Sequence, residues 1–237
     1  MVLPWLRDTE PMATDRDQRL RTLEAARLYF VCDGLPGGRD AAPLLDAALR
    51  GGADIVQLRE KSSRRDEELI ALADPFRRAA AEHRALFILN DRPDLVAACG
   101  ADGVHVGQED MPVADARQLA GPEALVGLST HSRQQVEAAC AAAGVDRPDQ
   151  ISVGPVWATP TKEGRPGTGL GLIEYAASEA TVPWFAIGGI DSRNVSSVVA
   201  AGAERIVVVR AIRDAEVPAA AAHHLREALE TGVGAPR

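Results

Sequence analysis

Short apolar runs alternate along the chain with longer stretches whose apolar residues recur every three or four positions. The short runs are typical of β-strands, and the longer spacing is typical of amphipathic helices. Eight runs are predicted to be strands: Leu28–Cys32, Asp54–Leu58, Leu86–Asn90, Gly103–Val106, Leu125–Ser129, Gln150–Val153, Trp184–Ile187 and Arg205–Val209. Helices are predicted at Ala42–Arg50, Asp66–Glu82, Pro93–Cys99, Val113–Leu119, Arg133–Ala143, Leu172–Ala180, Arg193–Ala201 and Val217–Glu230.

Strict alternation of strand and helix predicts a parallel sheet with right-handed crossovers. Eight such units can close on themselves, so we predict an α/β fold that is a single (β/α)8 TIM barrel. The alternative is an open doubly wound sheet that binds a dinucleotide. That fold places a Gly-rich turn after its first strand, and residues 33–38 lack the required glycine spacing. The barrel is therefore the favoured fold.

The length and composition suit one domain. With 237 residues, of which 46% are hydrophobic, the chain is long enough to form one barrel with a large core. The catalytic barrel is predicted to occupy residues 27–230. Residues 1–26 are expected to form a short extension that is partly disordered, and residues 231–237 a frayed tail.

Net charge and cysteine content narrow the class of partner. The formal net charge of −8 argues against a nucleic-acid partner, whose phosphates the overall field would repel. We recognise no signal peptide and no apolar run of membrane-spanning length, so no membrane partner is expected. Cys32, Cys99 and Cys140 are widely spaced and are expected to be reduced core thiols of a cytoplasmic protein. The sequence allows a homo-oligomer without specifying one.

A polar segment follows the second predicted strand, at the end of the barrel where the chemistry of this fold lies. Alternate side chains of a strand share a face, so Gln57, Arg59 and Lys61 are expected to point together, away from Leu58. One amide and two cations suit an anion of high charge, such as a diphosphate. The segment by itself is equally compatible with a solvated strand end that carries ordinary surface charge.

Two carboxylates follow the third and fourth predicted strands. Asn90 and Asp91 end the third strand, and Asp110 lies in the polar loop after the fourth. Two acids facing a diphosphate repel it unless a divalent cation lies between them, and Mg²⁺ prefers such oxygen ligands. Each acid alone is better explained as a cap or turn residue before Pro93 or Pro112. Their arrival from neighbouring strands favours a magnesium-diphosphate site.

His105 alternates with Gly103 and Gly107 in the fourth predicted strand and is expected to face the barrel interior. The glycines leave room for a ligand. A histidine satisfied by a neighbouring carboxylate is the commoner arrangement, so we assign His105 no catalytic role.

The loop after the sixth predicted strand is longer than most strand-to-helix connections. Thr159 and Thr161 offer two hydroxyls and Lys162 a further cation, which makes the loop a candidate substrate clamp. Composition alone slightly favours a flexible Gly/Pro/Thr surface loop.

Glycine and backbone N–H groups are concentrated at the ends of the last two predicted strands. Gly188 and Gly189 follow the seventh strand, and Val209 and Arg210 end the eighth. Many barrels bind a phosphate monoester at these two loops, where glycine lets the anion approach the backbone. A Gly-Gly pair can also form a plain turn, but its position favours phosphate binding.

Together these segments resemble the thiamine-phosphate synthase family. The resemblance covers about Leu28 to Ile212 in the family's order. It rests on the motifs Gln57-Leu58-Arg59-Glu60-Lys61, Asn90-Asp91, His105-Val106-Gly107-Gln108-Glu109-Asp110, Gly127-Leu128-Ser129, Thr159-Pro160-Thr161-Lys162 and Ile187-Gly188-Gly189-Ile190. It implies a single-domain barrel that joins a hydroxymethylpyrimidine diphosphate to a thiazole phosphate and releases pyrophosphate and thiamine phosphate.

The resemblance also implies roles for individual residues. The pyrimidine diphosphate is assigned to Gln57, Arg59, Lys61, Asn90 and Lys162, and Mg²⁺ to Asp91 and Asp110. The thiazole phosphate is assigned to Thr159, Thr161, Gly189 and the amides of Val209 and Arg210. Ser129 is assigned to the reacting centre, so the candidate catalytic residues are Lys162, Ser129 and Arg59. The family often has a small hydroxyl residue at the position of Arg210, where this chain offers either a positive charge or only a backbone N–H.

The implied mechanism needs no protein nucleophile, because an amino-substituted pyrimidine can delocalise the cation left by the departing diphosphate. This agrees with the absence of a recognisable Ser/His/Asp or Cys/His constellation in the sequence. Two alternatives stay open. A thiazole tautomerase binds a similar thiazole phosphate without a diphosphate, and a non-catalytic phosphate-binding barrel needs no acids. The joint presence of Asp91, Asp110 and the basic strand end favours the synthase.

Overall fold

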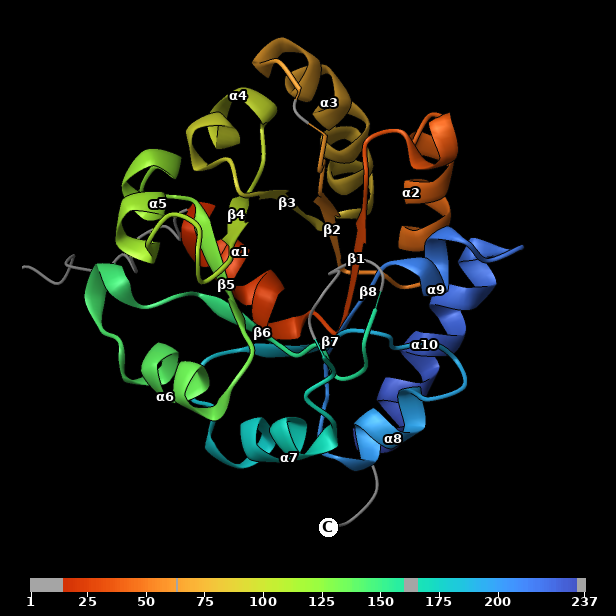
Figure 1. Cartoon of the computed structure of the whole chain (residues 1–237). Helices are drawn as coiled ribbons and strands as arrows, with labels where there is room; N and C mark the ends of the chain where they lie inside the picture. The colour runs from red at the N-terminus through yellow and green to blue at the C-terminus, as the bar shows by residue number, and fades with distance from the viewer. Residues whose placement is uncertain (1–14, 63, 160–165, 234–237) are drawn as a thin grey trace, which may run out of the picture.

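The chain folds into a closed barrel of eight parallel strands, each hydrogen-bonded to the next in chain order, with β8 pairing with β1 (Figure 1). The computed structural model describes residues 15–62, 64–159 and 166–233. Its strands are β1 (Leu28–Cys32), β2 (Ile55–Leu58), β3 (Leu86–Asn90), β4 (Gly103–Val106), β5 (Leu125–Thr130), β6 (Gln150–Val153), β7 (Trp184–Ile187) and β8 (Ile206–Val208). The predicted (β/α)8 barrel is therefore confirmed.

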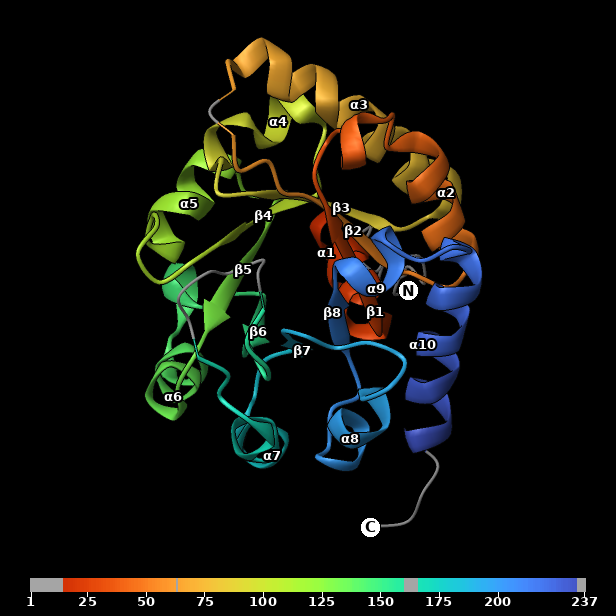
Figure 2. The ribbon, with the colours of Figure 1, turned by 45° about the vertical axis from the view of Figure 1, so that its right-hand side comes forward.

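Helices surround the strands as an outer ring, which Figures 1 and 2 show from two directions, except that the first helix lies behind the strands, within the ring, in Figure 1. They are α1 (Asp15–Ala25), α2 (Ala42–Arg50), α3 (Asp66–His83), α4 (Val96–Cys99), α5 (Val113–Ala120), α6 (Arg133–Ala141), α7 (Leu170–Glu179), α8 (Val195–Ala200), α9 (Arg210–Arg213) and α10 (Pro218–Val233). Short 3-10 turns lie at η1 (Pro36–Gly38), η2 (Pro93–Leu95) and η3 (Gly144–Asp146). No helix of the described residues is long and apolar enough to cross a membrane.

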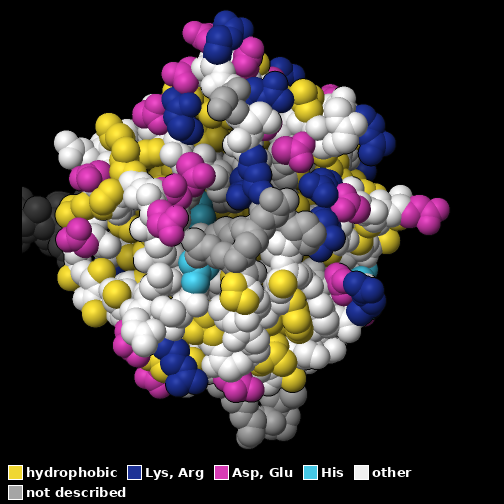
Figure 3. Space-filling model, viewed as in Figure 1, with side chains coloured by type: hydrophobic (Ala, Val, Ile, Leu, Met, Phe, Trp, Pro, Cys, Tyr) yellow, Lys and Arg dark blue, Asp and Glu magenta, His cyan; other side chains and the backbone are white. Residues whose placement is uncertain are grey.

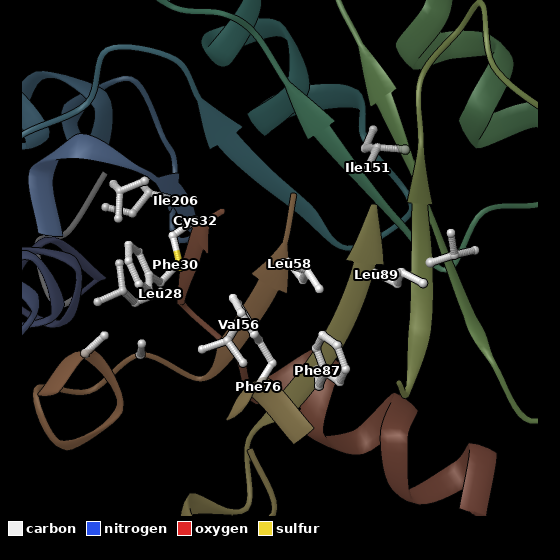
Figure 4. Packing of buried hydrophobic residues seen from close by; sticks show 14 of the residues in the cluster. Leu28, Phe30, Cys32, Val56, Leu58, Phe76, Phe87, Leu89, Ile151 and Ile206 are labelled. Carbon is white, nitrogen blue, oxygen red and sulfur yellow. The ribbon is translucent and has the colours of Figure 1, made fainter. Parts of the chain in front are cut away.

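The buried apolar residues form two layers. The larger layer fills the space between strands and helices and includes Leu28, Phe30 and Leu58. Figure 4 shows part of it, in which Phe76 of α3 lies beside Phe87 of β3 with ring centroids 5.6 Å apart. The smaller layer fills the barrel interior and includes Tyr29, Val31, Ile55, Leu125 and Phe185. Successive residues of a strand enter opposite layers, as the pleat requires.

An aspartate lies immediately before each of the strands β2, β4 and β6. The first of them, Asp54, was predicted to begin β2, but the strand begins at Ile55. The Asp54 carboxylate accepts hydrogen bonds from the backbone N–H groups of Arg27 and Leu28 at 2.7 and 3.0 Å. Asp102 accepts from the N–H of Phe87, and Asp149 from that of Val126. Each carboxylate accepts a hydrogen bond from a backbone N–H group at the beginning of a neighbouring strand. The side chain of Asp54 therefore caps the beginning of β1, and Asp54 is not a residue of β2.

Within the extension predicted at residues 1–26, residues 15–25 form the helix α1, which the sequence did not predict. Leu23 is buried among the interior side chains, so α1 packs against the amino-terminal end of the barrel. Arg16 forms an ion pair with Asp149 at 2.5 Å, and Arg19 with Asp102 at 2.8 Å. The helix escaped prediction because it is polar and depends on carboxylates far away in the sequence.

Candidate active site

A cavity of about 330 Å³ opens at the carboxyl ends of the strands. Its wall combines strand ends from all around the barrel with the loops after β6, β7 and β8. Lining residues include Tyr29, Gln57, Arg59, Asn90, His105, Ser129, His131, Thr159, Gly188, Gly189, Val209 and Arg210. Figure 3 shows this face, where basic, acidic and histidine side chains gather around the centre. Of the described site residues that the sequence predicted, all but Lys61, Asp91 and Asp110 line this cavity.

The basic strand end after β2 divides between two cavities. Gln57 and Arg59 line the main cavity, and Gln57 Nε2 donates to Tyr29 Oη at 2.9 Å. Lys61 instead lines an adjoining cavity of about 450 Å³, together with Arg59 and Arg210. The reason is that β2 ends at Leu58, so the alternation that aligns Gln57 with Arg59 does not extend to Lys61. Arg59 lies on the wall common to both cavities.

Asp91 and Asp110 lie close enough to Arg59, which lines the cavity, to interact with its charge, although neither acid lines the cavity itself. Desolvation by surrounding protein atoms, followed by the nearby Asp110 carboxylate, raises the pKa of Asp91 to about 6 although one side of the residue stays exposed. Arg59 opposes that shift, and burial lowers the pKa of Arg59 itself while both acids oppose the lowering. A hydrogen-bond interaction with the Asp110 side chain adds to the raised pKa of Asp91. The cause of this shift is therefore burial together with a second carboxyl group close by.

Local backbone geometry places the acid pair. Asp91 has a φ of 62°, in the left-handed region that aspartate tolerates better than most residues. Its N–H donates to the carbonyl of His105 at 2.9 Å, which ties the loop after β3 to β4. Asp110 accepts the N–H of Gly107 at 2.8 Å, so its carboxylate folds back toward the end of β4.

A row of polar side chains lies beneath the cavity, and Ser129 and His105 both face the cavity from it. His105 Nε2 lies 3.0 Å from Ser129 Oγ and 3.4 Å from Ser152 Oγ, while Nδ1 lies 3.1 Å from Gln150 Nε2. The expected interior position of His105 is therefore observed. The partners of its ring include the Gln150 amide and the hydroxyls of Ser129 and Ser152.

Backbone conformation and close packing both favour glycine at positions 188 and 189, directly after β7. Gly188 has a φ of 106° and Gly189 a φ of 70°, which other residues adopt with strain. A Cβ at Gly188 would lie 2.4 Å from that of Pro155. Among the described hydrogen bonds, none uses the backbone N–H of Gly189 or of Arg210. Both N–H groups lie at the cavity wall, where they can bind an anion.

The loop after β6 is only partly described. Thr159 lines the cavity, whereas Thr161 and Lys162 lie outside the described residues. For Arg210 the sequence left two roles open, a positive charge or only a backbone N–H. Arg210 lines both cavities, and its charge contributes to lowering the pKa of Asp191, after the larger effect of Arg193.

Sequence reasoning missed several polar residues that line the cavity, among them His131 and Tyr29. His131 lines the cavity, and its Nδ1 donates to the carbonyl of Gly154 at 2.5 Å. Tyr29, the partner of Gln57, also reaches the cavity from β1. His131 could have been found from its position one residue after β5. Tyr29 gave no such signal, because it lies within an apolar strand.

Residues 28–212 match the family described as thiamine monophosphate synthase. The chain belongs to the thiamine monophosphate synthase family. A thiamine-phosphate synthase of Arthrobacter sp. (strain FB24) is 49% identical over 230 residues, covering 89% of this chain and 97% of that protein. One of Thermobifida fusca (strain YX) is 48% identical over 221 residues, covering 92% and 100%.

A solved thiamine phosphate pyrophosphorylase from Pyrococcus furiosus has the same architecture. It superposes with a TM-score of 0.78 at 29% identity, covering 90% of this chain and 99% of that one. The family match spans β1 to α9 and so includes every strand of the barrel and the cavity that the strands form. Membership in the thiamine monophosphate synthase family makes the chain an enzyme of the transferase class.

Proposed function

We propose that this chain is a thiamine-phosphate synthase, which condenses 4-amino-2-methyl-5-hydroxymethylpyrimidine diphosphate with 4-methyl-5-(2-phosphoethyl)thiazole. The products are thiamine phosphate and pyrophosphate. The observation that carries the proposal is the interaction of Asp91 and Asp110 with Arg59, from three neighbouring strand ends, beside a cavity that Arg59 lines in a chain of this family. One cation and two acids at one point suit a metal-chelated diphosphate and have no evident use in binding a lone phosphate monoester.

The acid pair fits Mg²⁺. Its oxygen donors are hard, and burial together with the nearby Asp110 carboxylate raises the pKa of Asp91, which supports a compensating cation at the pair. Within the described ranges, no cluster of three or more His, Cys, Asp or Glu side chains could hold a metal ion. Mg²⁺ commonly takes one or two carboxylates and completes its shell with water and substrate phosphates. When bound, it would neutralise charge on the diphosphate.

The remaining residues act by position and charge. Gln57, Arg59, Lys61, Asn90 and Lys162 hold the diphosphate, and Ser129 lines the reacting centre. Thr159, Thr161, Gly189 and the N–H groups of Val209 and Arg210 hold the thiazole phosphate. Gly189, Arg210 and Arg59 reach the same cavity from the ends of β7, β8 and β2, which supports two anion sites within it.

The reaction breaks the bond between the pyrimidine methylene carbon and the diphosphate oxygen, and the electron pair leaves with the diphosphate. The aminopyrimidine ring delocalises the resulting cation, and the thiazole nitrogen then supplies the electron pair of the new C–N bond. Arg59 and the other cations stabilise the charge that develops on the leaving group, and the cavity holds the two rings in line. No residue has to act as a nucleophile.

Pyrophosphate release tests the proposal. Wild-type protein is mixed with both substrates and Mg²⁺, and parallel reactions omit one component each. Equimolar pyrophosphate and thiamine phosphate are expected only in the complete mixture. Isomerisation of a thiazole phosphate without pyrophosphate would identify a tautomerase, and binding without turnover would identify a non-catalytic barrel. Either result would refute the proposed activity.

A further inference from the structure

Gln150 occupies a buried position that the proposed chemistry does not explain. It begins β6, is 4% exposed and does not line the cavity. Strand register places His105 of β4 opposite Gly127 of β5, and Gly127 opposite Gln150. The three residues therefore form one row across adjacent strands, one layer below the row of Ser129 and Ser152.

Gly127 allows the outer members of this row to meet. A Cβ at Gly127 would lie 2.2 Å from Gln150 Nε2 and 2.5 Å from His105 Nδ1, far inside van der Waals contact. With no side chain in the middle position, Gln150 reaches across and places its amide 3.1 Å from the imidazole. The contact thus depends on a glycine whose backbone is otherwise that of an ordinary strand residue.

The orientation of the amide follows from what lies at its other end. Gln150 Oε1 is buried and has no hydrogen-bond partner among the described residues. A reversed amide would put two unpaired N–H donors in that place, and buried orphan N–H groups are rarer than under-satisfied carbonyls. The amide nitrogen therefore faces His105 Nδ1. A donor at this position requires Nδ1 to be the acceptor, so the neutral ring carries its proton on Nε2.

The proton on Nε2 determines what Ser129 can offer a substrate. Nε2–H donates to Ser129 Oγ at 3.0 Å, so the hydroxyl acts as an acceptor below and keeps its own hydrogen available. The part of the chain that the structure describes contains no second hydrogen bond of that hydroxyl. Since Ser129 lines the cavity, the available hydrogen can be donated to an acceptor atom of the substrate.

We infer that Gln150 is a positioning residue, which fixes the Nε2–H tautomer of His105 and thereby makes Ser129 a hydrogen-bond donor toward the substrate. The inference rests on the proposed function, because it presumes that Ser129 faces the reacting pyrimidine diphosphate. Gln150 itself touches no substrate. Its effect on turnover passes through His105 and Ser129 alone.

The tautomer is measured directly by NMR on protein labelled with ¹⁵N-histidine, with the His105 resonances assigned by their loss in His105→Gln. The inference expects protonated Nε2 and unprotonated Nδ1 in wild type, whether or not the protein is an active synthase. A protonated Nδ1 would overturn it. This readout separates failure of the inference from failure of the proposed function.

Kinetics test the route through Ser129. Gln150→Leu is expected to lower kcat at least tenfold, within the roughly 10²-fold cost of losing one positioned donor, and to leave KM for the thiazole phosphate nearly unchanged. In a Ser129→Ala background the same substitution should have no further effect on kcat. An undiminished effect in that background would refute the inference, since it would show a general structural role.

Two further variants keep the test decisive. Thr130→Val removes another buried hydrogen bond between β5 and β6, from Thr130 Oγ1 to Ser152 O, and should retain wild-type kcat. Gln150→Glu keeps the shape of the side chain if the leucine variant does not fold. Its carboxylate should draw the proton to Nδ1 and lower kcat, and wild-type kcat with a reversed tautomer would contradict the inference.

Discussion

At the scale of single residues, Asp91 combines a strained backbone with an unfavourable charge. Its φ of 62° and its pKa of about 6 both depart from what aspartate prefers. Such departures persist where the surrounding structure enforces them, and they cluster at functional sites. The proposed Mg²⁺ would neutralise the repulsion between the two carboxylates, so metal binding would explain why Asp91 is kept in this strained conformation.

Asp91→Asn tests that use. Asparagine fits the left-handed conformation and retains the shape of the side chain, but it is a poor ligand for Mg²⁺. We expect kcat/KM to fall by about 10²-fold or more, while far-UV circular dichroism stays unchanged. Asp94 lies three residues further along the chain and forms an ion pair with Arg92. The variant Asp94→Asn therefore serves as the control and should keep near-normal turnover. Equal turnover in both variants would remove Asp91 from the site.

The same substitution has an opposite effect on the stability of metal-free protein. Because folding raises the pKa of Asp91 from 3.8 to about 6, the protonated carboxyl stabilises the fold at low pH, and this contribution is lost as pH rises between those two values. Asparagine never ionises and retains it. The melting temperature of Asp91→Asn should therefore exceed that of wild type at pH 8 and approach it only as the pH falls to about 4. A difference that does not change with pH would contradict the raised pKa.

At the scale of elements, the strand starts and the strand ends have separate tasks. At the starts, Asp149 accepts the N–H of Val126 and pairs with Arg117 at 3.0 Å and Arg16 at 2.5 Å. Its side chain is 8% exposed, so the cluster behaves as a largely buried ion network. This network ties α1 to the barrel at the end away from the cavity.

Asp149→Ala should therefore change stability and leave the chemistry intact. Removal of the carboxylate leaves two arginines and a backbone N–H without their partner, which costs about 3 kcal/mol of unfolding free energy. Arg16→Ala, at a more exposed position, should cost about 1 kcal/mol or less. Urea unfolding measures both, with exposed Asp146→Ala as the control. A loss of turnover at temperatures where Asp149→Ala stays folded would contradict the separation of tasks.

The elements that sequence periodicity predicted are those whose stability comes from an apolar face. Five strands, from β1 at Leu28–Cys32 to β7 at Trp184–Ile187, have the predicted bounds, because each is an uninterrupted apolar run between turns. α1 was missed because Arg16 and Arg19 find their partners only in the folded barrel. The residues at strand ends were predictable from topology. Gln150 and Tyr29 were not, because their roles depend on contacts between strands.

At the scale of the whole molecule, an acidic protein carries a local cluster of basic side chains beside its main cavity. The chain has a formal net charge of −8, yet Arg59, Lys61, Arg64, Arg210 and Arg213 line the cavity that adjoins the main one. A local basic wall within an acidic protein retains attraction for a small polyanion. In the proposed complex the acid pair would confine the divalent ion to one side of this wall.

The central claim is that the acid pair and the basic wall together bind a chelated diphosphate. Isothermal titration of inorganic pyrophosphate, with and without Mg²⁺, tests it most directly. Wild type is expected to bind at least tenfold more tightly with Mg²⁺, whereas Asp91→Asn/Asp110→Asn should lose that dependence. Arg59→Ala should weaken binding in both conditions. A double variant that keeps the full effect of Mg²⁺ would contradict the account.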